Sequence, residues 1–122
     1  VAPGDRHLLV GGTLQHPEAR LSDAPAVNFC RPSVDPMFAS AASLLGPQLL
    51  AVVLTGMGTD GLAGAREVKA QGGTVIAQDP ASSVVWGMPG AVVRAELAAA
   101  VLGVDAIAEY VARAALPVEA DG

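Results

Sequence analysis

Residues 49–77 read LLAVVLTGMGTDGLAGAREVKAQGGTVIA, and they carry the clearest structural signal in the chain. Leu49–Thr55 is continuously apolar with β-branched residues, which is typical of a strand covered on both faces in a parallel sheet. Leu62–Ala70 alternates apolar and charged residues and is followed by two glycines, so it predicts a helix. Thr74–Ala77 predicts a second buried strand. Strand, helix and strand within about thirty residues indicate a βαβ unit, whose crossover is almost always right-handed.

A longer helix is expected before this unit. Ser33 or Asp35 can accept the free amide protons of a first helical turn, and Pro36 is tolerated in that turn. Gly46-Pro47 ends the run. Apolar residues recur at helical spacing between these signals, at Val34, Met37, Phe38, Ala41, Leu44 and Leu45. The pattern predicts an amphipathic helix.

Shorter elements are expected toward both ends of the chain. His7–Val10 and Thr13–Gln15 are extended pieces on either side of Gly11-Gly12, so they predict a hairpin that turns at these glycines. The elements expected after the βαβ unit are a short helix from Pro89 through Val93, a strand at 99–102 and a helix at 104–115. Residues 1–116 are expected to form the folded portion, and residues 117–122 an acidic tail.

Composition sets limits on the class of protein. The chain has 122 residues, 52% hydrophobic and 16% charged, which suits one ordinary domain. Twelve acidic against seven basic residues give a net charge of −5, with Lys69 as the single lysine, which argues against a nucleic-acid surface. The lone Cys30 excludes an internal disulfide and is expected to be an inert core or loop residue. No apolar run reaches the roughly eighteen residues of a membrane helix, so no membrane insertion is expected.

The turn Gly56–Gly61 follows the first predicted strand, at the position where open parallel sheets place ligands and reacting groups. It matches the dinucleotide-binding pattern G-x-G-x-x-G, and Asp79 after the next strand would then hold a ribose hydroxyl. Asp60 argues against this interpretation, because its carboxylate would oppose the pyrophosphate at the helix N-terminus. A dinucleotide-binding βαβ unit therefore stays open as a lesser alternative.

Asp60 is easier to understand as a group that must be negative. The positive end of the following helix and the turn amides would stabilise its charge. Such an anion can orient and stabilise a histidine that activates a nucleophile. The backbone amide of Met57, in the same turn, can hydrogen-bond a developing oxyanion. The spacing leaves a second role open, in which Asp60 caps the helix that begins at Leu62.

Five segments in a fixed order resemble the catalytic domain of the chemotaxis protein-glutamate methylesterase family, the CheB proteins. They are VAPGDRH (1–7), RPSVD (31–35), LTGMGTDG (54–61), AQD (77–79) and VWGMP (85–89). The resemblance runs from Val1 to about Tyr110. It implies an α/β fold with a doubly wound, mostly parallel sheet and flanking helices. It also implies a Ser-His-Asp mechanism that hydrolyses glutamate methyl esters on chemoreceptors and, in many members, deamidates receptor glutamines.

The resemblance assigns roles to two residues of the glycine turn. It makes Asp60 the aspartate of the triad, and it makes Met57 the donor of a backbone amide to the oxyanion hole. The implied partners are the cytoplasmic helices of methylated chemoreceptors and a receiver domain in the same parent chain; the implied location is the cytoplasm, with no cofactor. Trp86 and Met88 are expected to pack, with lining of the substrate cleft as the alternative.

The family's serine and histidine precede the segment that matches residues 1–4. We therefore expect this chain to be a C-terminal portion of the domain, to lack its N-terminal strands, to leave its sheet partly uncovered and to be inactive alone. His16 imitates a family Gln-His motif but follows residues 1–4, so it is expected to be a solvated hairpin residue. His7 is expected to be structural or on the surface, and Ser82 and Ser83 to be loop or helix-start serines, since they lack a Gly-x-Ser-x-Gly turn. A non-catalytic module that binds receptors or another partner remains the main alternative.

Overall fold

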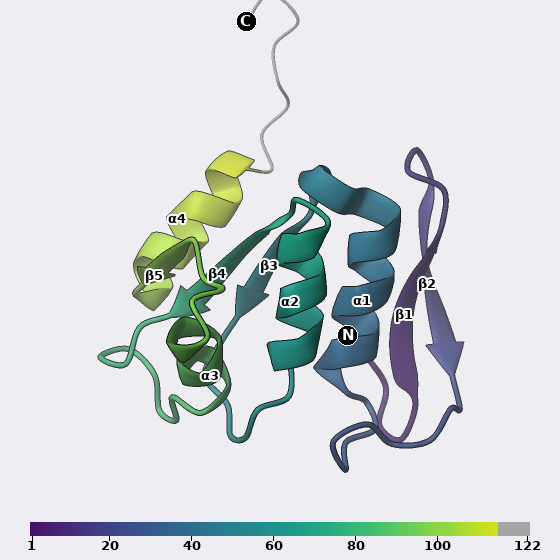
Figure 1. Cartoon of the computed structure of the whole chain (residues 1–122), viewed down its shortest axis with the longest axis horizontal. Coiled ribbons are helices and arrows are strands. Elements are labelled where there is room, and N and C mark those ends of the chain that lie inside the picture. Colours follow the sequence, from purple (N-terminus) through teal and green to yellow (C-terminus); the bar gives the residue numbers. More distant parts are fainter. Residues whose placement is uncertain (115–122) are drawn as a thin grey trace, which may run out of the picture.

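The computed structural model describes residues 1–114 as an α/β fold (Figure 1). Its elements are β1 (His7–Gly12), β2 (Pro17–Ser22), α1 (Val34–Leu45), the 3₁₀ turn η1 (Gly46–Gln48), β3 (Leu50–Val53), α2 (Leu62–Ala70), β4 (Thr74–Gln78), α3 (Met88–Arg94), β5 (Ala100–Leu102) and α4 (Val104–Ala114). The expected domain boundary at residue 116, the tail 117–122 and the helix end at Ala115 lie outside the described residues. No helix within the described range is long and apolar enough to cross a lipid bilayer.

A parallel sheet of three strands, in the order β3-β4-β5, forms the centre of the fold. Helix α2 connects β3 to β4, and α3 connects β4 to β5, so the predicted βαβ unit is present and is repeated. The predicted α/β class with a parallel sheet and flanking helices is confirmed. Figure 1 shows α1 between α2 and the β1–β2 hairpin, with the loops that enter α1 and α2 at the same end of the molecule.

Small side chains build the core between the sheet and the helices. The buried cluster consists of Phe38, Ala42, Ala51, Val53, Ala65, Val68, Val75 and Val92. Helices α1 and α2 pack closely at Gly64, where an added Cβ would lie 2.6 Å from the Cβ of Phe38. Because no side chain separates the two helices there, their first turns lie within hydrogen-bonding reach of each other.

The hairpin turns later than its glycines predict. Strands β1 and β2 pair antiparallel through Gly12, and Thr13 and His16 close the turn with backbone hydrogen bonds of 3.2 and 3.1 Å. The prediction of a turn at Gly11-Gly12, with Thr13–Gln15 as the second strand, is therefore wrong. Gly12 has a φ of 82°, which ends the first strand with a left-handed residue just before the turn.

Strand β3 is shorter and less covered than the apolar run predicts. It ends at Val53, and Leu54 is 49% exposed. Ala51 and Val53 are buried, but the alternate residues of the strand are only half-buried, and its outer edge pairs with no strand among residues 1–114. The expectation of cover on both faces is wrong for β3, and the expectation of a partly uncovered sheet is confirmed there. Strand β4, by contrast, is buried along its last four residues.

Candidate active site

The loop before α3 fixes the turn between β3 and α2. The Gly56 N–H donates to the Val85 carbonyl, and the N–H groups of Gly87 and Met88 donate to the Gly56 carbonyl, each over 2.9 Å. Gly87 has an ordinary φ of −77°, yet an added Cβ would lie 2.8 Å from the Gly56 oxygen and 2.9 Å from the Gly58 nitrogen. Gly87 is therefore required because two backbones meet at that point.

The Asp60 carboxylate at the end of that turn faces the first turn of α1. The Ser33 hydroxyl donates to its Oδ1 at 2.6 Å, the Val34 N–H donates to its Oδ2 at 2.8 Å, and the Asp35 N–H lies 3.3 Å from Oδ1. The interpretation of Asp60 as the cap of the helix beginning at Leu62 is wrong, since it caps a helix that begins 26 residues earlier. The positive helix end beside its carboxylate is likewise that of α1, not that of α2.

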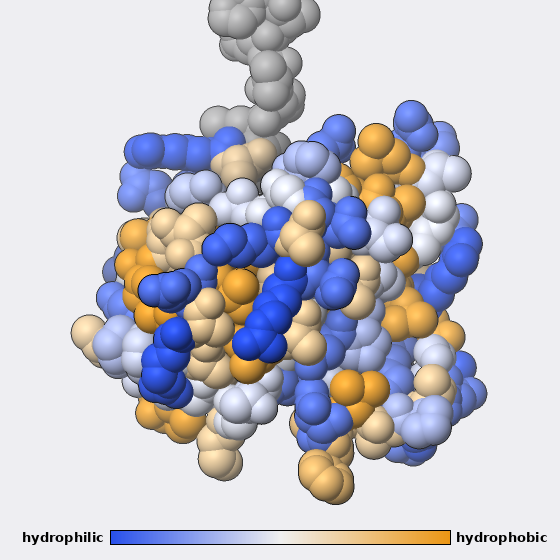
Figure 2. Space-filling view, in the orientation of Figure 1, coloured by the Kyte–Doolittle hydropathy of each residue, from blue (hydrophilic) through white to orange (hydrophobic). Residues whose placement is uncertain are grey.

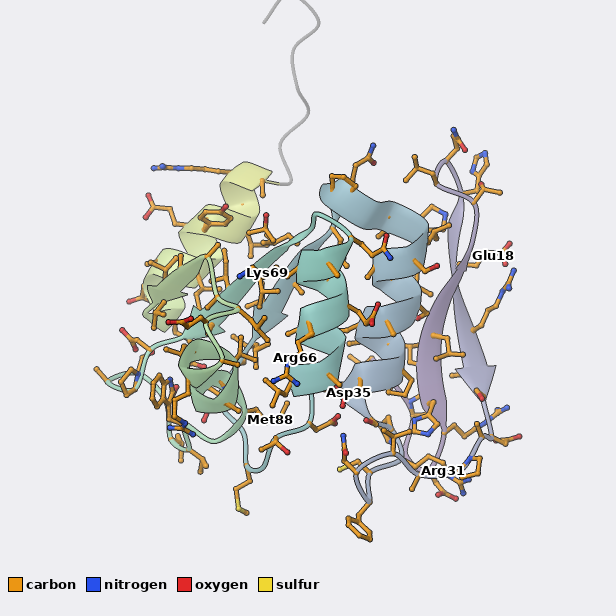
Figure 3. The ribbon with its side chains drawn as sticks, viewed as in Figure 1. Glu18, Arg31, Asp35, Arg66, Lys69 and Met88 are labelled. Carbon is orange, nitrogen blue, oxygen red and sulfur yellow. The ribbon has the colours of Figure 1, made fainter. Side chains whose placement is uncertain are left out.

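Asp35 makes the reciprocal contact with α2. It is buried, and its Oδ1 accepts the N–H groups of Gly61 at 3.0 Å and Gly64 at 2.8 Å. Figure 3 shows Asp35 between the two helices. These amides are the ones that a pyrophosphate would need at the start of α2. The dinucleotide alternative is therefore wrong, because an aspartate of the protein already occupies that anion position.

Asp79, the ribose ligand of that alternative, is held by its own loop. The Ser82 hydroxyl and the Ser82 N–H donate to its Oδ1 at 2.7 and 2.9 Å. These hydrogen bonds hold the pKa of Asp79 below its usual range. The Ser83 hydroxyl donates to the Asp79 carbonyl at 2.7 Å. Both serines are loop residues, as the sequence predicts.

A hollow of about 300 Å³ lies beside Asp60. Two segments line it, Asn28–Cys30 and Met57–Asp60. Asp60 is only half-buried, the Met57 side chain is 76% exposed, and the Met57 N–H has no protein acceptor among the described residues. An acyl-transfer site needs a carboxylate for its histidine and an amide for its oxyanion, and Asp60 and Met57, the residues that carry these groups, both line this hollow.

The two histidines lie outside the hollow. His7 is 2% exposed, its Nδ1 accepts the Ser33 N–H at 3.1 Å, and its Nε2 lies 2.9 Å from the Pro25 carbonyl. Because Nδ1 is an acceptor, Nε2 carries the proton and donates to Pro25. His7 thus has the structural role that the sequence predicts, and it holds the residue whose hydroxyl binds Asp60. His16 is exposed in the hairpin turn, which is also as predicted.

The other residues that the sequence indicates have packing or loop roles. The Trp86 Nε1 donates to the Gln78 carbonyl at 2.6 Å, and the Arg94 guanidinium lies 5.8 Å from the ring centroid. Met88 packs against the hydrophobic core. The packing prediction for Trp86 and Met88 is therefore confirmed, and neither lines the hollow beside Asp60. Cys30 is a half-buried loop residue.

Sequence reasoning missed the groups that surround the Asp60 carboxylate. It predicts Ser33 as the cap of its own helix, but the Ser33 side chain makes no such bond and donates to Asp60 instead. It gives no role to Asn28 or Phe29, although both line the hollow. The available signal was the pair of motifs RPSVD and GMGTDG. Their polar residues contact each other in the folded chain.

Known proteins resemble this chain over most of its length. The family described as CheB methylesterase matches residues 1–111. The chain is 53% identical over 113 residues to a protein-glutamate methylesterase/protein-glutamine glutaminase of Rhodopseudomonas palustris. The aligned region covers 93% of this chain and 29% of that protein. A Caulobacter vibrioides protein of the same description is 55% identical over 116 residues, or 92% of this chain and 33% of that protein. The chain thus spans about a third or less of the length of these relatives.

A solved structure shares the fold. The CheB methylesterase catalytic domain of Thermotoga maritima matches with a TM-score of 0.86 and 41% sequence identity, over 89% of this chain and 58% of that chain. At this identity the likeness extends beyond the general arrangement of helices and strands to the sequence itself. The family match also covers nearly the whole chain. The chain belongs to the CheB methylesterase family.

Proposed function

We propose that residues 1–116 form the C-terminal portion of a protein-glutamate methylesterase catalytic domain. We call the full-length enzyme the longer polypeptide in which a segment with the serine and the histidine precedes residue 1. This enzyme hydrolyses glutamate methyl esters on the cytoplasmic helices of chemoreceptors. The observation that carries the proposal is one hollow lined both by the half-buried Asp60 and by Met57, whose N–H has no protein acceptor among residues 1–114. A receiver domain in the same protein and a cytoplasmic location belong to the same proposal.

In the proposed mechanism each group of the turn has one task. The Asp60 carboxylate accepts the Nδ1–H of the histidine, which takes the proton from the serine hydroxyl as the serine attacks the ester carbonyl. The Met57 amide donates to the oxyanion of the tetrahedral intermediate. The histidine then protonates the departing methoxide, methanol leaves, and water hydrolyses the acyl-enzyme to glutamate. An amide passes through the same kind of intermediate, so the relatives' glutaminase activity is compatible with the same groups.

Three donors already occupy most of the hydrogen-bonding positions of the Asp60 carboxylate, and this favours its proposed role as the triad aspartate. Ser33 and the first two amides of α1 approach it from one side. A carboxylate has about four lone-pair positions, so one remains for a histidine that approaches from the hollow. The bonds to α1 fix the orientation of the carboxylate before the histidine arrives, and such preorganisation is what a triad aspartate needs.

Methanol release provides the test. Full-length enzyme is expected to release methanol from a receptor cytoplasmic fragment that carries glutamate methyl esters, and residues 1–122 alone are expected to release none above background. Adding the serine- and histidine-bearing segment to residues 1–122 as a second polypeptide should restore part of the release. If the full-length protein binds the receptor fragment but releases no methanol, the chain belongs to a non-catalytic receptor-binding module and the proposal fails.

A further inference from the structure

The wall of the hollow opposite the glycine turn has an unfavourable backbone conformation. Asn28 and Phe29 are consecutive non-glycine residues with φ values of 53° and 63°. Asparagine adopts this left-handed region readily, but it is sterically unfavourable for a bulky residue such as Phe29, where it persists only if the surroundings hold it. The role of this loop therefore depends on the contacts that hold its backbone and on the side chain that it exposes at the rim of the hollow.

Two tethers hold this loop in place. Val27 and Cys30 exchange backbone hydrogen bonds of 2.9 Å in both directions across the two left-handed residues. The Asn28 side-chain amide donates to the Asp35 Oδ2 at 2.8 Å, and Asp35 is the buried aspartate that caps α2. The loop is thereby joined to the same helix ends that hold Asp60. Its shape is fixed relative to the proposed catalytic carboxylate.

This fixed loop presents an aromatic ring to solvent. Phe29 is 105% exposed, in a chain of which only 3% is aromatic. In Figure 3 the loop just before Arg31 projects from the lower edge of the molecule, and Figure 2 shows apolar surface projecting along that edge. The ring gains no burial within residues 1–114 that would offset the strain. Met57, also largely exposed, stands on the other lining segment of the hollow.

We propose that Phe29 is a substrate-positioning residue of the enzyme under "Proposed function", on which this inference rests. Its ring packs against apolar side chains of the receptor helix on either side of the glutamate methyl ester, and so holds the ester carbonyl over the Met57 amide. An ester carbonyl that accepts a hydrogen bond from the Met57 amide lies at the rim of a hollow that Phe29 also lines. A helix presents side chains three and four positions from the ester on the same face, within reach of such a ring.

Two substrates separate positioning from a structural role. In the full-length enzyme, Phe29→Ala is expected to lower kcat/KM for a methylated receptor fragment by about 10-fold, a loss typical of truncating an aromatic contact residue. For N-acetyl-glutamate γ-methyl ester, which has no neighbouring side chains, the change should stay within about 2-fold. Phe29→Tyr, which keeps the ring, should retain receptor hydrolysis within about 3-fold.

Stability should move in the opposite direction from activity. Phe29→Gly removes the steric conflict at positive φ, so it is expected to raise the unfolding temperature by about 2 to 4 °C while lowering receptor hydrolysis as Phe29→Ala does. The matched control is Leu14→Ala, which truncates a 42% exposed apolar residue in the hairpin turn at the opposite end of Figure 1 and should change neither substrate.

Each outcome decides the inference. If Phe29→Ala leaves receptor hydrolysis unchanged, or lowers both substrates equally, Phe29 does not position the substrate. If Phe29→Gly lowers the unfolding temperature, the ring is part of the fold and the inference is overturned. If the wild-type enzyme releases no methanol from either substrate, the proposed function itself fails. This result differs from an active enzyme whose receptor hydrolysis does not change in Phe29→Ala.

Discussion

Replacing Asp60 with asparagine should lower methanol release by the full-length enzyme by about 10³- to 10⁴-fold. An asparagine in this position presents an NH₂ group or a neutral oxygen to the histidine, so it neither selects the productive tautomer nor stabilises the imidazolium that forms when the serine loses its proton. The loss should appear in kcat with little change in KM, because the carboxylate acts on the reacting groups rather than on the receptor.

The fold should survive this change. Asparagine can still accept the Val34 N–H with its carbonyl oxygen while its NH₂ group donates to the Ser33 hydroxyl, so the cap of α1 is weakened but retained. The expected cost to the free energy of unfolding is about 1 kcal/mol. Urea unfolding of the same samples measures it.

Asp79→Asn is the matched control. Asp79 follows the neighbouring strand, β4, and lies outside the hollow. An asparagine at this position can keep both hydrogen bonds from Ser82 through its carbonyl oxygen. Its activity should stay within about 2-fold of wild type, because surface substitutions away from a site have small effects. An Asp60→Asn enzyme that keeps its activity, or an Asp79→Asn enzyme that loses as much, would remove Asp60 from the triad.

Gly87→Ala should have the second-largest effect, about a 100-fold loss of kcat, because misplacing a reacting group by about 1 Å costs this much. The new Cβ would lie 2.8 Å from the Gly56 oxygen and 2.9 Å from the Gly58 nitrogen. Both are backbone atoms without rotamers to adjust, so the turn must move. Met57 lies between them, and its amide would leave the position from which it stabilises the oxyanion.

Gly4→Ala is the control for the general effect of replacing a glycine with alanine. An alanine at Gly4 meets no heavy atom within 4 Å, yet it restricts the unfolded chain as much as the alanine at residue 87 does. We expect unchanged kcat for Gly4→Ala, and for Gly87→Ala a loss of kcat that exceeds any loss of receptor binding. Equal activity of the two variants would show that the turn tolerates displacement and that the Met57 amide is not the oxyanion donor.

The sequence predicts those parts of the fold that local rules determine. The run Leu49–Thr55, the charged face of Leu62–Ala70 and the paired glycines after it are each short-range signals, and they identify β3, α2 and β4. The hairpin turn shows the limit of such rules. Glycine usually marks a turn, but Gly12 ends a strand, and the turn at Thr13–His16 contains no glycine at all.

The candidate site depends on contacts between distant residues. Capping rules compare a residue with the helix that directly follows it, so they assign Asp60 to α2 and Asp35 to α1. In the folded chain the assignments are exchanged, because α1 and α2 begin side by side and each aspartate reaches the other helix. The close packing at Gly64 helps to bring the two helix starts together, and no local pattern reports it.

A crystal structure of the full-length enzyme would test the central claim most directly, through the distance from the Asp60 carboxylate to the nearest histidine Nδ1. We predict about 2.6 to 3.2 Å, with the imidazole entering from the hollow beside Met57 and its Nε2 toward a serine hydroxyl. An imidazole paired with a different carboxylate, or a hollow filled by side chains that leave Asp60 bonded to α1 alone, would contradict the account.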